Sequence, residues 1–338
     1  MATSLARLVW RPAVAAVLAL AAAGALIAHS LLVSADRFDP GTSLVNARFT
    51  TARAVHQATP AVDVGSHAYK WPVKPFNRQH PVRGYFGDPR IANHGESRQF
   101  HFGVDISAPN ETPVHATITG TVYIHPLHPT TVAIVGPNGK EFSYWHVVPT
   151  VRNGQRAIAY KTVIGRIEAP YGHVHFSEAR DGLYLNPLRP GAMGPYADDT
   201  RPRVTSVRAE HAGRIALVAE AYDETPLAVP RPWHDLPVMP VLVRWRLLDT
   251  KGRSVLGWRT AADFRMTIPP ASTFDEVWAP RTMQNHVRAP GRYRVYLSRS
   301  LTGLRAGKYV VEVTARDTGG NAAVERFALE IASALSGS

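Results

Sequence analysis

The stretch Gly172-His173-Val174-His175-Phe176 decides how this chain is interpreted. If it is a strand, successive side chains alternate between two faces, so His173 and His175 point to the same side. Val174 and Phe176 then point into a core. Two histidines on one face can divide their work, because an imidazole can bind a metal ion or transfer a proton near neutral pH. The stretch therefore predicts a strand that presents two imidazoles, and the rest of a site must come from elsewhere.

The composition is that of a globular protein with many turns. The chain has 338 residues, of which 45% are hydrophobic, with 25 Gly and 27 Pro, and this suits about two domains made of short strands. It has no cysteine, which excludes a disulfide framework, a thiolate metal site and a cysteine nucleophile. The net charge of +12 favours an anionic partner or surface. Because the basic residues form no dense run, we expect no nucleic-acid partner.

The N-terminus is typical of an export signal. Arg7 and Arg11 precede an apolar run, residues 13–33, and small residues follow it before Asp36. The run is long enough to span a bilayer. We therefore expect an extracytoplasmic protein, secreted or anchored, in which residues 1–35 are either a cleaved signal peptide or a membrane-anchor helix.

Glycine, proline and polar residues divide the remainder of the chain. Residues 36–68 show no sustained period and are predicted to be a linker or arm. Residues 69–196 hold brief strands, among them a hairpin with its turn at Asn138-Gly139. The polar stretch 197–202 marks a boundary. Residues 201–335 alternate through strand after strand, which predicts an immunoglobulin-like β-sandwich domain. The expected fold class is mainly β.

His101-Phe102-Gly103-Val104-Asp105 places an imidazole and a carboxylate four residues apart. Gly103 and the nearby Pro109 disfavour a helix that would put both on one face. A fully extended strand would separate the two side chains by about 13 Å, which is too far to share one ion. We therefore predict a bend at Gly103 that folds His101 and Asp105 together.

His146 is a further candidate. It ends a predicted strand, and alternation places it on the same face as Phe142 and Tyr144. The chain then offers two imidazoles and a carboxylate for a metal ion, with two imidazoles left over. Zinc in hydrolytic sites typically has three N or O protein ligands and one open position for water. No His-Glu-x-x-His motif supplies a glutamate as general base, and the spare histidines fit that role.

Eight short stretches between Arg83 and Pro187 carry a more specific signal. In chain order they are Gly84 to Arg90, His101 to Ile106, Thr112 to Ala116, Gly120 to Val122, Tyr144 to Val147, Asn153 to Gln155, Ile164-Gly165 and His173 to Phe176. In order and spacing they resemble the catalytic domain of the lysostaphin/LytM-type zinc metallopeptidases, the M23 peptidase family. Each stretch is weak alone, whereas the ordered combination is specific. The resemblance implies a LytM-like antiparallel β-sheet catalytic domain in residues 69–196.

The resemblance also implies an activity and assigns residues to it. Members of the family cleave peptide bonds in peptidoglycan cross-links, which makes peptidoglycan the expected partner. The positive charge of the chain would also suit attraction to anionic wall polymers. One zinc ion per chain is expected, with His101, Asp105 and His175 as its ligands. His146 and His173 would be the catalytic histidines, which position and deprotonate the attacking water and stabilise the oxyanion. The oligomeric state is left open.

Two other interpretations stay open. A catalytically silent LytM-like module could bind the wall or regulate other hydrolases, although such relatives are recognised by lost ligands or lost catalytic histidines. An adhesin built on the β-sandwich would explain the C-terminal half but not the five candidate residues. Within that half, Asp223 and the stretch from Asp317 to Asn321 could suggest calcium, but aspartates in such turns more often form the turn itself.

Overall fold

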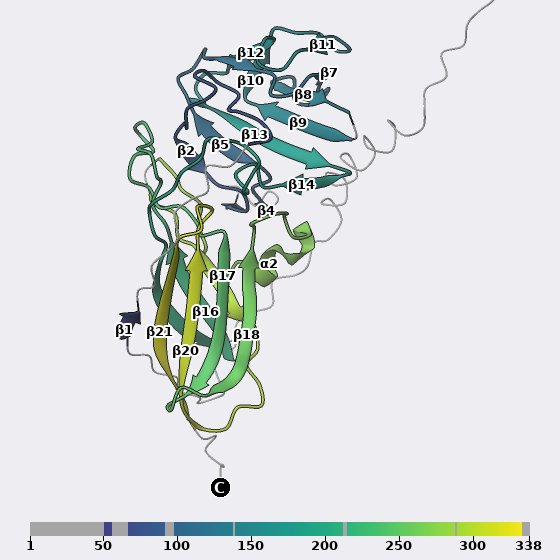
Figure 1. The fold of residues 1–338 in the computed structure, drawn as a ribbon. Helices are drawn as coiled ribbons and strands as arrows, with labels where there is room; N and C mark the ends of the chain where they lie inside the picture. Colours follow the sequence, from purple (N-terminus) through teal and green to yellow (C-terminus); the bar gives the residue numbers. More distant parts are fainter. Residues whose placement is uncertain are drawn as a thin grey trace, which may run out of the picture. The chain divides into compact units, whose positions relative to one another are not determined.

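Strands are the main regular structure of the described chain (Figure 1). The computed structural model describes residues 51–55, 67–91, 98–137, 139–211, 215–287 and 289–332. Within them lie a short 3-10 helix, η2 (Ala271–Thr273), and a short α-helix, α2 (Phe274–Val277). The prediction of a mainly β fold is confirmed. No helix in these ranges is long and apolar enough to cross a membrane. The predicted signal or anchor, residues 1–35, and most of the predicted linker lie outside the described residues.

One antiparallel sheet organises the first half of the described chain. Its strands follow the order β11-β7-β8-β9-β13-β5-β2, and β14 also pairs with β13. Their bounds are β2 (Val82–Gly84), β5 (Val104–Ser107), β7 (Gly120–Ile124), β8 (Thr131–Val135), β9 (Lys140–Trp145), β11 (Arg156–Ala157), β13 (His173–Arg180) and β14 (Leu183–Leu185). Figure 1 shows β13 between β9 and β5. The stretch from His173 to Phe176 is thus the start of a central strand.

Two smaller antiparallel sheets complete this half. One has the order β10-β12-β6, and the other pairs β3 with β4. Their bounds are β3 (Pro89–Arg90), β4 (Gln99–Phe100), β6 (Pro113–His115), β10 (Val147–Pro149) and β12 (Val163–Ile167). The predicted hairpin is present, because β8 and β9 pair antiparallel across the turn that contains Gly139. The predicted strand ends one residue before His146, however, and a new strand, β10, begins one residue after it.

The second half consists of two further antiparallel sheets. One sheet has the order β1-β21-β20-β17-β18, and another has the order β15-β16-β19. The bounds are β1 (Thr51–Val55), β15 (Arg203–His211), β16 (Ile215–Tyr222), β17 (Leu242–Asp249), β18 (Ser254–Asp263), β19 (Arg294–Ser298), β20 (Gly307–Arg316) and β21 (Ala322–Ile331). Inward residues such as Trp245, Val311 and Phe327 are buried in the core. The immunoglobulin-like assignment and the domain boundaries stay predictions.

Phe264 joins the two halves into one hydrophobic core. Residues 43–338 form a single compact unit. The Phe100 ring packs against Phe264 at a centroid distance of 5.5 Å and against Phe274 at 5.1 Å. A Cβ placed on Gly87 would lie 2.4 Å from the Phe264 ring, and Gly87 also has a φ of +94°. Asn186 Nδ2 donates to the carbonyl oxygen of Phe264 at 3.0 Å. Only glycine allows this close packing.

Candidate metal centre

β13 presents the two histidines of the first-quoted stretch on one face. Val174 and Phe176 are fully buried on the opposite face. His173 and His175 are 4% and 6% exposed and both approach Asp105. His173 Nε2 lies 3.5 Å and His175 Nδ1 3.2 Å from Asp105 Oδ1. The alternation predicted for this stretch is confirmed.

A bend at Gly103 brings His101 beside Asp105. Asp105 lies in β5, opposite His175 of β13, so the sheet register fixes these two residues together. His101 Nε2 lies 3.1 Å from Asp105 Oδ1 and 2.7 Å from His175 Nδ1. A Cβ at Gly103 would lie 2.4 Å from the carbonyl oxygen of Phe176, so a larger residue would push the chain out of this bend. The predicted bend is confirmed.

The three atoms that meet here form an acceptor cluster that fits zinc. His101 Nδ1 donates to the carbonyl oxygen of Tyr85 at 2.8 Å, which leaves a lone pair on Nε2. In a tetrahedral site with zinc–ligand distances of about 2.0–2.1 Å, neighbouring ligand atoms are about 3.3 Å apart. His101 Nε2 lies 2.7 Å from His175 Nδ1 and 3.1 Å from Asp105 Oδ1, and His175 Nδ1 lies 3.2 Å from Asp105 Oδ1. These distances are close to that spacing. Their N and O chemistry is also that of hydrolytic zinc sites.

The ionisation of the cluster suits a cation. Burial alone would raise the pKa of Asp105, but His101 and Arg90 outweigh it and hold that pKa well below its usual range. Burial lowers the pKa of His101, and it lowers the pKa of His175 to about 3. Near pH 7 the cluster is therefore one carboxylate and two neutral imidazoles, the forms in which these side chains bind metal ions.

Arg90 binds the Oδ2 atom of Asp105. It was not among the predicted site residues. Its Nη2 donates to Asp105 Oδ2 at 2.6 Å, which leaves Oδ1 to the histidines. Gly84 makes this pair fit, because a Cβ there would lie 2.4 Å from Asp105 Oδ2 and 2.6 Å from Arg90 Nη2. Gly84 and Arg90 are the first and last residues of the first of the eight stretches. Their position in that stretch was the only sequence feature that could have pointed to a role in the site.

The face predicted for His146 is wrong. Strict alternation would put it with Phe142 and Tyr144, which are fully buried in the core. Instead His146 has a φ of +62°, in the left-handed region, and this ends the alternation of β9. Its ring turns toward His173, at a centroid distance of 4.7 Å, and stacks on Tyr171 at 3.9 Å. One unusual dihedral angle therefore delivers the side chain to the candidate site.

The environment of His146 keeps its imidazole neutral. Burial, reinforced by His173, lowers the pKa of His146 to about 3. A neutral imidazole near pH 7 can accept a proton. The structure thus gathers all five predicted residues, with His146 reaching the group through its contact with His173.

His173 is held from behind by Arg83. Arg83 Nη2 lies 2.7 Å from His173 Nδ1, and the carbonyl oxygen of Tyr171 lies 2.9 Å from the same nitrogen. Both contacts cannot be hydrogen bonds, because arginine only donates and a carbonyl only accepts. The shorter contact involves a charged donor and is the stronger one. His173 Nδ1 is then the acceptor, and Nε2 carries the hydrogen that faces Asp105.

Four other histidines of the first half, His94, His115, His125 and His128, have no match among the functional residues of the resembled family. His115 is buried against an aromatic ring from another loop. His125 and His128 pack against Trp145, at centroid distances of 6.2 and 5.4 Å. His94 lies outside the described residues.

Three aspartates lie together in a separate cluster, one from the boundary stretch 197–202 and two from the second half. Asp198, Asp223 and Asp317 are 5%, 2% and 5% exposed, and one oxygen of each lies within 4.8 Å of the others. Asn321 N donates to Asp317 Oδ1 at 2.8 Å, and Glu224 N donates to Asp223 Oδ1 at 2.8 Å. These bonds agree with the prediction that the aspartates form turns. Burial, with repulsion from Asp317, raises the pKa of Asp223 to about 8.

Asp223→Asn is expected to change how stability depends on pH. The pKa of Asp223 is higher in the folded than in the unfolded protein. Its contribution to the free energy of unfolding is therefore fully present below the unfolded value of 3.8 and is lost as pH rises through about 8. A neutral amide removes that loss, and we expect a gain on the order of 2–4 kcal/mol at pH 8 and little change at pH 4. Thermal unfolding at both pH values, in buffer with a chelator, measures the difference.

Asp199→Asn is the matched control, because Asp199 is exposed next to the cluster. Its unfolding temperature is expected to follow that of the wild type at both pH values. Equal pH dependence for Asp223→Asn and the wild type would contradict the expected role of the buried carboxylates.

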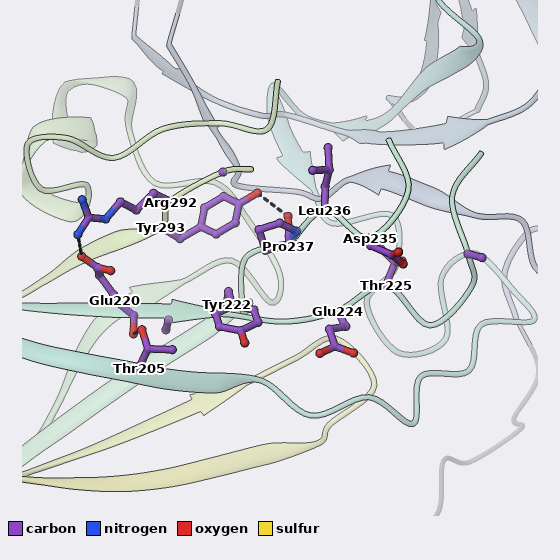
Figure 2. A pocket seen from close by; sticks show the side chains of 13 residues that line it. Thr205, Glu220, Tyr222, Glu224, Thr225, Asp235, Leu236, Pro237, Arg292 and Tyr293 are labelled. Carbon is purple, nitrogen blue, oxygen red and sulfur yellow. Dashed lines mark hydrogen bonds and ion pairs between the residues drawn. The ribbon is translucent and has the colours of Figure 1, made fainter. Parts of the chain in front are cut away.

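A cavity of about 710 Å³ lies within the second half, and none of the predicted site residues line it. Figure 2 shows its lining, in which Arg292 pairs with Glu220, and Tyr293 donates to the carbonyl oxygen of Pro237 at 3.1 Å. Its other carboxylates are paired as well, Glu224 with Arg203 at 3.4 Å and Asp235 with His234 at 2.5 Å. Its charged groups are satisfied within the protein, which sets it apart from the acceptor cluster around Asp105.

The sequence matches no family model and no curated protein. Among solved structures, it is similar to a zinc-containing peptidase from Vibrio cholerae, at 22% identity over 36% of this chain and 39% of that chain, with a TM-score of 0.30. It is also similar to a mutant catalytic domain of the prophage-encoded M23 protein EnpA from Enterococcus faecalis. That match has 21% identity over 39% of this chain and 98% of that chain, with a TM-score of 0.27.

A further neighbour is the complex of SpoIIIAH and SpoIIQ, at 22% identity over 36% of this chain and 97% of that chain, with a TM-score of 0.29. M23 peptidases are thus among the structural neighbours of the chain. At these identities and TM-scores, likeness assigns neither a family nor an activity.

Proposed function

We propose that the chain is an exported zinc metalloendopeptidase that hydrolyses peptide bonds in peptidoglycan cross-links. The observation that carries this proposal is the convergence of His101 Nε2, Asp105 Oδ1 and His175 Nδ1 at separations of 2.7, 3.1 and 3.2 Å. His101 Nε2 and Asp105 Oδ1 are acceptors, so without an ion His175 Nδ1 would carry a hydrogen between them, and a bound cation would take the place of that hydrogen. Two further histidines beside the cluster supply the groups that a hydrolytic reaction needs.

The residues of the chain divide the work of hydrolysis. When bound, zinc supplies a nucleophile at neutral pH and polarises a carbonyl group. His146, whose ring lies 4.7 Å from that of His173, accepts the proton of the attacking water. His173 offers its Nε2 hydrogen to the oxyanion that develops on the substrate carbonyl. Arg90 keeps Asp105 in place through its 2.6 Å bond to Oδ2.

The proposed location is outside the cytoplasm, in contact with the cell wall. This part of the proposal is supported by the apolar run in residues 13–33 behind two arginines. The net charge of +12 would draw the chain toward anionic wall polymers, and this attraction is screened by salt.

A silent wall-binding or regulatory module is the second candidate. It is favoured by the burial of the site, since His101, Asp105, His173 and His175 are each at most 6% exposed. A substrate would have to reach groups that are nearly covered. The complete set of five residues favours the enzyme, because a silent module has no use for His146 and His173 beside a metal site.

Digestion of purified peptidoglycan tests the proposal. The zinc-loaded wild-type chain is expected to release cross-link peptides, and His173→Ala is expected to release them at least about 100-fold more slowly while keeping its zinc. His234→Ala is the control, because His234 is exposed and lies outside the site. Mass spectrometry of the released fragments identifies the bond that is cut. A zinc-loaded wild type that releases nothing would leave the silent module as the better account.

A further inference from the structure

A small cavity lies directly beside the candidate metal centre. Its volume is about 70 Å³, and Asp105, Arg83 and Arg90 line it. Trp233 and Gln284, which come from loops of the second half, line it as well. The second half of the chain therefore contributes residues to the surroundings of the site.

Arg83 is the unusual group in this cavity. Arg90 pairs with Asp105 at 2.6 Å, but Arg83 forms no ion pair with a carboxylate of the described residues. It is half-buried, and burial lowers its pKa, although nearby Asp105 opposes that effect. A cation that is partly removed from water without a counter-ion is unfavourable in the free protein. An anionic group of a ligand would remove that cost.

Trp233 fixes the guanidinium in place. The Arg83 guanidinium lies over the Trp233 ring, 4.4 Å from its centroid. A guanidinium that stacks by its face keeps N–H groups at its edge, and that edge matches the two oxygens of a carboxylate. One of these N–H groups is used by His173 Nδ1 at 2.7 Å, which places Arg83 within one side chain of the reacting groups.

The cavity is large enough for a carboxylate group. Its volume of about 70 Å³ is several times the roughly 10–15 Å³ that one water needs on the same measure. A carboxylate at the end of a chain or at the tip of a side chain also matches the N–H edge of Arg83. Asp88 also lines the cavity, and its Oδ2 is already the acceptor for the backbone N–H of Tyr85 at 2.9 Å.

We propose that Arg83, held by Trp233, binds a free carboxylate of the substrate next to the bond that is cleaved. The chain would then select peptides that end in, or branch to, a carboxylate at that position. This inference rests on the proposed function and narrows its substrate class. It also gives the second half a part in substrate recognition, through Trp233.

Matched acid and amide substrates test the proposal. The zinc-loaded full chain is given short N-acetylated peptides, in L and D forms, each made with a free C-terminal carboxylate and as the primary amide. The wild type is expected to favour the acid by about 10–100-fold in kcat/KM, the range of one charged hydrogen-bonded pair. In Arg83→Gln the acid-to-amide ratio is expected to fall to about one. Equal cleavage of acid and amide by an active wild type would overturn the proposal.

Further variants separate recognition from damage to the fold. Arg83→Lys keeps the charge and should retain part of the preference, and Trp233→Phe should retain more of it than Trp233→Ala. Arg152→Gln removes an equal charge from an exposed turn and is expected to keep the wild-type ratio. If the acid-to-amide ratio of kcat/KM were unchanged in both Arg83 variants, Arg83 would not bind the carboxylate.

Binding without turnover distinguishes failure of this inference from failure of the proposed function. Nuclear magnetic resonance titration of the full chain with N-acetyl-dialanine, its amide and inorganic phosphate needs no hydrolysis. Tighter binding of the acid than of the amide, lost in Arg83→Gln, supports the carboxylate site even if no peptide is cut. Phosphate binding as tightly as the acid would indicate a general anion site and would overturn the proposal.

Discussion

His175→Ala is expected to abolish stable zinc binding. The substitution removes one of three converging ligand atoms, the Nδ1 that lies 2.7 Å from His101 Nε2 and 3.2 Å from Asp105 Oδ1. Loss of a residue that only supports a ligand typically weakens metal binding by about 10–100-fold, and loss of a ligand itself should cost more. We expect at least about 1,000-fold weaker binding and no measurable peptide hydrolysis. Competition with a chromophoric chelator measures the affinity.

His173→Ala serves as the comparison for this prediction. It removes a neighbouring imidazole on the same face of β13 but, in the proposed site, no metal ligand. Its zinc affinity is expected to stay within about 10-fold of the wild type. If His175→Ala and the wild type bound zinc equally well, the proposed ligand set would be wrong.

His146→Asn is expected to retain zinc and lose most of the hydrolytic rate. Asparagine is chosen because His146 has a φ of +62°, a conformation that asparagine tolerates far better than alanine. The substitution removes the proton acceptor while keeping the backbone of the loop. Loss of a positioned acid–base group lowers the rate by about 100- to 10,000-fold. Single-turnover kinetics at matched zinc occupancy measure the change.

The variant His146→Ala tests the role of the backbone in the same experiment. It lacks the imidazole too, and it adds strain at the left-handed position, so it is expected to be less stable than His146→Asn. A rate for His146→Asn within about threefold of the wild type would assign the proton acceptor to another residue, since a positioned acid–base group is worth far more.

Local pattern was sufficient to predict β13 and the bend before β5. Alternation requires only that the strand be regular, so His173 and His175 could be placed on one face without other information. At Gly103, the distance that an extended chain would impose excluded a straight strand, and the bend was the remaining solution. Both predictions depend on a few neighbouring residues, and short-range sterics decide them.

Features that depend on a single dihedral angle or on distant contacts could not be predicted. His146 was placed on the wrong face because its own left-handed φ ends the alternation of β9 at that residue. Arg83 and Arg90 were not assigned roles, since nothing local to an arginine shows which carboxylate or imidazole it will meet. The contact between Trp233 and Arg83 joins residues of separate halves, and such a pairing follows from tertiary packing alone.

The close packing of Phe264 on Gly87 affects whether the two halves of this chain could be exchanged separately by gene recombination. Gly87 lies three residues before Arg90, so the aromatic ring of the second half supports the very segment that steadies Asp105. A gene fusion that replaced the second half with an unrelated module would uncover this segment and Phe100 to water. The two halves are therefore poor candidates for independent exchange. A successful hybrid would need an aromatic side chain in the place of Phe264.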